Sequence, residues 1–222
     1  MLKMSMRVIW AVCGKIQCSI MIKKRLITAL FIIQPVLASP LSEGALRLIK
    51  IGNEIGSPAV VTNGQSLLLK GMFKFNDLDS AYEASKQARL GSALMGHPPQ
   101  IAIANKILSK LLKQGYDPAI YDSALYLLDG GGGFAKNELM ALKLLEESVK
   151  VHANAQSAFI AAVIRNESLV PGTKDMRRID ELITYAVLNK VKGATKYQAQ
   201  HIDSGRWRSL KVKNWRKWIA SQ

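Results

Sequence analysis

The sequence is poor in cysteine and histidine, which argues against a disulfide-stabilised domain and against a metal site. Its two cysteines, Cys13 and Cys18, are too few for a domain held together by disulfides. No G-x-S-x-G nucleophile motif occurs. The histidines lack a second ligand at metal-binding spacing; they are His97, His152 and His201. We therefore predict no catalytic, metal-binding or cofactor-binding residue, and a protein that is not an enzyme.

Acidic residues are scarce relative to basic ones. Sixteen aspartates and glutamates stand against 31 lysines and arginines, which gives a formal net charge of +15. Aromatic residues make up 7% of the chain, but apolar residues make up 49%, enough for a packed core. The length of 222 residues allows one or two domains.

Residues 21–38 have the composition of a secretory signal peptide. A positive segment at 23–25 precedes an apolar segment at 26–33, and the residues that follow suit a cleavage site between Ala38 and Ser39. We therefore expect an exported protein that is cleaved after Ala38.

No apolar segment near the N-terminus is long enough to cross a membrane, which takes about 20 residues. Residue 39 is serine, whereas a lipoprotein anchor would need cysteine there. Cleavage would remove six of the 31 cations and none of the 16 acids, so 25 cations would remain and the net charge would be +9. We expect Met21 to be the initiator and residues 1–20 to be an over-extended start.

A helix–turn–helix pattern begins at Pro118. Twelve residues with apolar side chains at helical spacing precede four glycines at 130–133, and a second amphipathic pattern follows Asn137, its expected N-cap. The pattern restarts at Ala155, 36 residues after Ala119. Such a period is typical of an α-solenoid, in which each repeat is a pair of helices.

The glycine run itself invites comparison with a phosphate-binding loop. That motif needs a lysine followed by serine or threonine directly after the glycines, and Phe134 and Ala135 stand there instead. We interpret residues 130–133 as the turn between two helices, because glycine enters left-handed backbone conformations without penalty.

The central unit resembles the Sel-one-like repeats, a family related to the tetratricopeptide repeats. The family unit reads roughly A-x-Y-x-L-G-x-x-Y-x-x-G-x-G-V, then D-x-x-x-A-x-x-W-x-x-x-A-A-x-x-G. Residues that match it outright are Ala119, Tyr121, Gly130, Gly132 and Ala141. Asn137 replaces the aspartate, Leu144 the tryptophan and His152 the closing glycine. The resemblance covers residues 78–194 and implies an all-α, right-handed solenoid of about three to four helix pairs.

The rest of the chain is organised around these repeats. Residues 39–77 are expected to form a diverged capping repeat, and residues 195–222 a basic, tryptophan-rich C-terminal segment. Expected helices span residues 41–54, 63–74, 78–94, 100–114, 118–129, 155–164 and 175–189.

The segment 205–222 combines tryptophan and positive charge and contains no acid. On a helix, Trp207, Trp215 and Trp218 would share one arc, with most cations outside it. Two interpretations are open. The tryptophans cover the end of the helical stack, or they contact an anionic membrane surface or an acidic protein. Nucleic acid is not expected, because an exported chain rarely meets it.

The resemblance implies protein–protein binding. We expect a periplasmic adaptor or scaffold that holds a protein partner in the groove formed by the first helix of each pair. Two alternatives stay open: a periplasmic immunity or inhibitor protein that neutralises a secreted phospholipase-type effector, and a membrane-surface scaffold of the envelope. The oligomeric state stays unknown. Candidate partner-binding residues are Lys86, Arg89, Tyr121 and Asp122, together with the tail residues Trp207, Trp215 and Trp218.

Overall fold

A computed structural model describes residues 39–203 and 212–222 of the chain. The predicted initiator Met21, the cleavage residue Ala38 and the tail residue Trp207 lie outside these ranges. Ser39, on the other side of the predicted cleavage site, lies within them.

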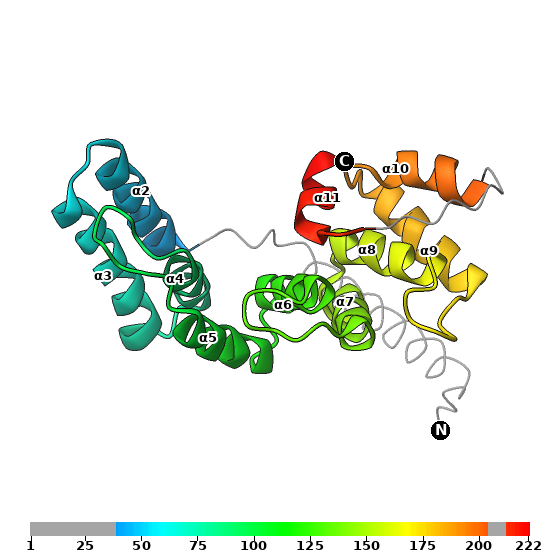
Figure 1. Ribbon diagram of the computed structural model, residues 1–222, viewed down its shortest axis with the longest axis horizontal. Coiled ribbons are helices and arrows are strands. Elements are labelled where there is room, and N and C mark those ends of the chain that lie inside the picture. Colours follow the sequence, from blue (N-terminus) through cyan, green and yellow to red (C-terminus); the bar gives the residue numbers. More distant parts are fainter. Residues whose placement is uncertain (1–38, 204–211) are drawn as a thin grey trace, which may run out of the picture. The chain divides into compact units, whose positions relative to one another are not determined.

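The described residues form helices joined by turns and loops, with an isolated antiparallel bridge between Ser92 and His97. Each helix from α2 to α9 packs against the next one in the chain, as Figure 1 shows. The prediction of an all-α fold is therefore confirmed. The elements are α2 (Pro40–Glu54), α3 (Pro58–Lys74), α4 (Leu78–Leu90), α5 (Ile101–Lys113), α6 (Asp117–Asp129), α7 (Glu138–His152), α8 (Ala155–Asn166), α9 (Met176–Leu188), α10 (Ala194–Tyr197), the π-helical segment η1 (Gln198–Asp203) and α11 (Trp215–Ser221).

Polar side chains fix where most of these helices start. An N-cap side chain accepts a hydrogen bond from a backbone N–H of the first turn, which would otherwise lack a partner. Asn137 does so for α7, as the sequence predicts. The other side-chain caps are Ser39, Asp77, Asn154, Asp175 and Asn214.

Two predicted helix boundaries are wrong by four or more residues. The second helix begins at Pro58 rather than residue 63, because proline has its φ preset for a first helical turn and lacks only an N–H that has no helical partner there. The third helix ends at Leu90 rather than residue 94. Gly91 follows it with φ of 69°, and its N–H bonds back to the carbonyl of Gln87.

The first helices of successive pairs are tied together at their N-terminal ends. The hydroxyl of Ser39, before α2, donates to the carboxylate of Asp77, before α4, at 2.5 Å. The phenol of Tyr116, before α6, donates to Asp79 in α4. The amide of Asn154, before α8, donates to Asp117 in α6 at 2.7 Å. These contacts, here called the N-terminal tethers, join residues 38, 37 and 37 positions apart.

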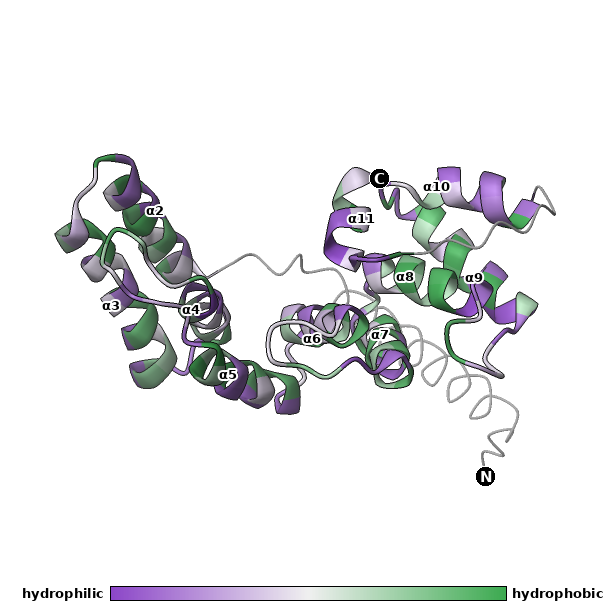
Figure 2. Ribbon diagram, in the orientation of Figure 1, coloured by the Kyte–Doolittle hydropathy of each residue, from purple (hydrophilic) through white to green (hydrophobic). Residues whose placement is uncertain are grey.

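The core is largest in the second half of the described chain. Every side chain from Ser157 to Ile164 in α8 is buried, and Figure 2 shows that hydrophobic residues dominate this helix. A helix that is apolar on all sides is stable only where neighbours cover it. Those neighbours include α6, α7, α9 and, through Trp215, α11.

The helices α2 and α3 approach so closely that a glycine is required between them. A Cβ on Gly64 would lie 2.7 Å from the carbonyl oxygen of Ala45 and 3.0 Å from the backbone nitrogen of Ile49. Gly44, also helical, has no atom within 4 Å of the equivalent position.

We predict opposite effects for alanine at these two glycines. Gly64→Ala should lower the free energy of unfolding by about 1–3 kcal/mol, because the backbone of α2 has to move. Gly44→Ala should raise it by about 0.5–1 kcal/mol, because alanine loses less conformational entropy in a helix. Urea unfolding followed by circular dichroism measures both. Equal effects at the two positions would contradict the close packing of α2 and α3.

The Asp77 tether should make stability depend on pH. Burial raises the pKa of Asp77, but hydrogen bonds from Ser39, Ser80 and the backbone outweigh it and lower the pKa below its ordinary value of 3.8. The folded chain thus binds this proton less readily than the unfolded chain. The contribution to stability is present above about pH 4 and is lost as the pH falls through the lower, folded value.

We expect Asp77→Ala to cost about 0.5–2 kcal/mol at pH 7, the usual cost of losing an N-cap. The difference from the unmodified chain should shrink as the pH falls below about 4. Unfolding by urea at pH 7, 5 and 3 measures it. Asp180→Ala, at an exposed position with the same change in charge, is the control. A difference that stays constant with pH would rule out the carboxylate as its cause.

Candidate functional site

The structure brings the four predicted groove residues into one neighbourhood on α4 and α6. Asp122 accepts hydrogen bonds from the phenol of Tyr82 at 2.8 Å and from the guanidinium of Arg216 at 3.0 Å. Tyr121 precedes it, and burial together with the charge of Asp122 raises the pKa of Tyr121 to about 12. The same two causes raise the pKa of Tyr82, so both phenols keep their protons at neutral pH.

Arg89 is held by the glycine turn between α6 and α7. It donates to the carbonyl of Gly132 at 2.7 Å and to the side chain of Asn105 at 2.5 Å. Its guanidinium carbon lies 4.2 Å from the ring centre of Tyr126, and that of Arg216 lies at the same distance from this ring. A Cβ on Gly132 would lie 2.5 Å from Arg89, so glycine is needed for this contact.

Lys86 makes an ion pair with Glu83 at 2.9 Å and lies over the ring of Tyr82. The predicted groove residues Lys86, Arg89 and Asp122 are therefore engaged with other parts of the chain. A partner that used their polar groups would compete with these contacts. Their role in binding stays a prediction.

Two of the three tail tryptophans, Trp215 and Trp218, pack within the chain. Trp215 is 3% exposed, and its backbone N–H donates a hydrogen bond to the carboxylate of Asp129 at 2.6 Å. Trp218 lies 5.7 Å from the ring of Phe159 and contacts Tyr197 edge-on. With α11 seated in this way, the indole of Trp215 offers no surface to a partner.

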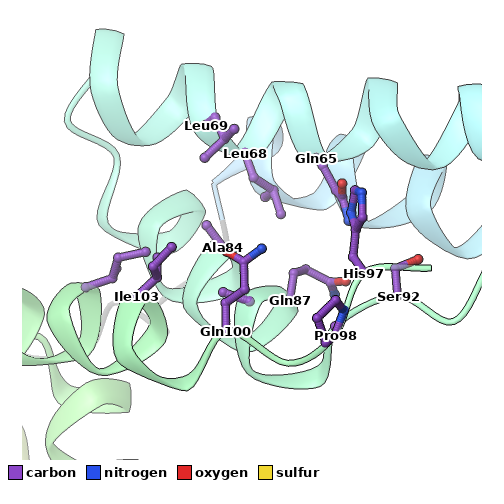
Figure 3. A pocket seen from close by; sticks show the side chains of 13 residues that line it. Gln65, Leu68, Leu69, Ala84, Gln87, Ser92, His97, Pro98, Gln100 and Ile103 are labelled. Atoms are coloured by element: carbon purple, nitrogen blue, oxygen red, sulfur yellow. The ribbon is translucent and has the colours of Figure 1, made fainter. Parts of the chain in front are cut away.

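A groove that sequence analysis missed lies between α3 and α5, with α4 as its floor. We call it the α3–α5 groove. It consists of two hollows of about 270 and 390 Å³, which share Leu69, Ile103 and Ile107 in their walls. Figure 3 shows the first hollow, with Leu68 and Leu69 of α3 on one side and Ala84 and Ile103 on the other.

Small and exposed apolar residues shape this groove. Ala81, Ala84 and Ala88 of α4 line it, and their short side chains give it depth. At its edges Leu69 is 46% exposed, Phe73 78% and Ile103 51%. Exposed apolar residues that border a hollow differ from isolated ones on a flat surface, because a ligand can bury them together.

The α5 wall of the groove is positively charged, because Lys106 and Lys110 line it. Lys70 and Lys74 belong to α3, and α5 carries Lys106, Lys110 and Lys113; neither helix contains an acid. An acidic residue that lines the groove is Asp77, whose carboxylate is engaged by Ser39 and Ser80. The signal was present in the sequence as five lysines among apolar residues in two acid-free helices.

Residues 39–203 and 212–222 contain no cluster of three or more histidine, cysteine, aspartate or glutamate side chains that could hold a metal ion. Within the same ranges, no helix combines the length and hydropathy that a membrane span requires. The predicted lone histidines stay apart: His97 lines the groove, His152 ends α7, and His201 stacks on Tyr197.

No family model, curated protein or solved structure matches the chain. The resemblance to Sel-one-like repeats therefore stays a prediction that rests on the residues quoted above.

We predict that Arg216 seats α11. Arg216→Ala removes the hydrogen bonds to Asp122 and the contact with Tyr126, so amide hydrogens of α11 should exchange about tenfold faster. Lys217→Ala, at an exposed neighbouring position, is the control. Hydrogen exchange read by mass spectrometry measures both. Equal exchange in the two variants would show that the tryptophans alone hold the helix.

Proposed function

We propose that the chain is a non-enzymatic protein-interaction module, an exported adaptor or scaffold that binds a protein partner. The observation that carries the proposal is the α3–α5 groove, an open apolar hollow bordered by exposed Leu69, Phe73 and Ile103. Grooves of this kind, with exposed apolar residues at their edges, are characteristic of protein-binding surfaces.

We further propose a Sel-one-like solenoid of about three to four repeats. The N-terminal tethers support it, because they join equivalent ends of α2, α4, α6 and α8 at separations of 37 and 38 residues. In this arrangement α2 and α3 are the diverged capping repeat of residues 39–77, and α4 to α9 belong to the repeats of residues 78–194.

An inhibitor of an acidic enzyme is the second candidate. The specific observation that favours it is the acid-free pair of helices α3 and α5, whose lysines would complement an acidic surface around an active site. An immunity protein against a secreted phospholipase-type effector is one such inhibitor. The membrane-surface scaffold loses support, since Trp215 and Trp218 pack against the chain itself.

The location is also a proposal. Export to the periplasm rests on the composition of residues 21–38. It predicts that the protein isolated from its own cells starts at Ser39, which N-terminal sequencing tests directly.

A capture experiment tests the function. The full chain with an affinity tag after Gln222 is expressed in its native cells and recovered from the envelope fraction. We expect one or more proteins in a fixed ratio to the chain. A single enzyme whose activity the purified chain suppresses would identify an inhibitor, and a larger assembly without suppression would identify a scaffold.

An unrelated exported protein of similar positive charge is the control. Recovery of the same proteins with both would show that charge alone attracts them. A chain recovered without any protein partner would contradict the proposal.

A further inference from the structure

We propose that the α3–α5 groove binds the apolar face of an acidic amphipathic helix supplied by a protein partner. The inference rests on the proposed function and names where the partner docks and which chemistry it presents. It follows from the shape of the groove, its apolar edges and the sign of its charge.

The shape fits a row of apolar side chains. The two hollows lie on either side of a shared constriction formed by Leu69, Ile103 and Ile107. An amphipathic helix presents side chains at positions i, i+3, i+4 and i+7 along one face. Successive side chains of that face would enter one hollow and then the other.

The edges show that the groove lacks an internal cover in the part of the chain that the structure describes. Phe73 is 78% exposed and Ile103 51%, although both line the second hollow. Burying such side chains is favourable, since the free energy of transfer grows with the apolar area removed from water. A partner that covers the groove would therefore gain binding free energy by burying Phe73 and Ile103.

The charge selects an acidic partner. Lys106 and Lys110 line the second hollow, and Lys70, Lys74 and Lys113 belong to the same two helices. In α9, by contrast, Arg177 and Arg178 pair with Glu181. Glutamate or aspartate on the flanks of a bound helix would meet the lysines and accelerate association.

The positive charge of the groove also disfavours the chain itself as the occupant. Residues 1–38 carry six lysines and arginines and no acid, so their charge has the same sign as that of the groove. A second copy that docked through the same groove would bring lysines against lysines.

A lipid surface or a nucleic acid also fits less well than a helix. Leu69 and Ile103 border a hollow rather than a projecting face, whereas an interfacial membrane segment buries an apolar face that projects from the protein. A phosphate backbone would meet the lysines but leave the apolar hollows unfilled.

The test uses the full chain and three labelled 18-residue peptides. The first has leucines at helical spacing on one face and glutamates elsewhere, the second has lysines in place of the glutamates, and the third is a scrambled version of the first. Fluorescence anisotropy measures binding. We expect the first peptide to bind at least about tenfold more tightly than either of the others.

Two pairs of variants locate the binding. Lys106→Glu/Lys110→Glu should weaken binding of the first peptide by about tenfold or more. Lys143→Glu/Lys150→Glu, at exposed positions of α7, changes the net charge by the same amount. This control should change the affinity for the first peptide by less than about twofold. Phe73→Ser should weaken binding by about five- to tenfold. Val151→Ser, 63% exposed on α7, should leave it unchanged.

The highly exposed position of Phe73 means that its replacement should leave the fold intact, and the circular dichroism unfolding midpoint checks this. Equal binding of the scrambled peptide would overturn the proposal, as would equal losses from the two lysine pairs. Vesicles of phosphatidylglycerol and phosphatidylcholine are titrated in parallel. Binding to vesicles that is lost with Phe73→Ser, without binding to the first peptide, would assign the groove to a lipid surface instead.

The outcome can be separated from that of the proposed function. A captured partner that binds Lys106→Glu/Lys110→Glu as tightly as the unmodified chain would overturn the groove as its docking site and leave the interaction module standing. Binding of the first peptide without any captured partner would support the groove as a helix-binding site and contradict the proposed function.

Discussion

The arrangement of the helices depends on the tethers between helix N-terminal ends. Ser39, Tyr116 and Asn154 each precede a helix and each donate a hydrogen bond to an aspartate at the start of a neighbouring first helix. An aspartate at a helix start is already favoured by the helix dipole and by N–H groups without a helical partner. The tethers therefore use groups that local structure has fixed, and they link α2 to α4, α4 to α6, and α6 to α8.

The two halves of the described chain differ in how completely side chains fill the space between neighbouring helices. Around α8 the space is filled, because α8 is apolar on all sides and α11 adds Trp215 and Trp218 to the same core. Around α4 it is not, because the floor residues Ala81 and Ala84 are short. A hollow results because the small residues of α4 leave space between α3 and α5.

Local signals in the sequence predicted the all-helical fold, the cap at Asn137 and the turn at residues 130–133, because each depends on a few neighbouring residues. The start of α3 was predicted too late because Val60 and Val61 lie in its first turn. Both are β-branched, and β-branched residues have low helix propensity. The groove could not be predicted, since it depends on which faces of α3 and α5 the tethers leave uncovered. The involvement of Arg89 with Gly132 was missed for the same reason: the two are 43 residues apart.

The two basic residue types have different roles, and the difference bears on function. Arginines such as Arg89, Arg165 and Arg216 are fixed by carboxylates, carbonyls or aromatic rings, for which the planar guanidinium is suited. The groove lysines differ: among the described contacts, Lys106 and Lys110 form no ion pair. A hydrated, flexible ammonium costs little to redirect toward an incoming carboxylate. Arginine thus stabilises the fold, and lysine at the apolar groove remains available to attract an acidic partner.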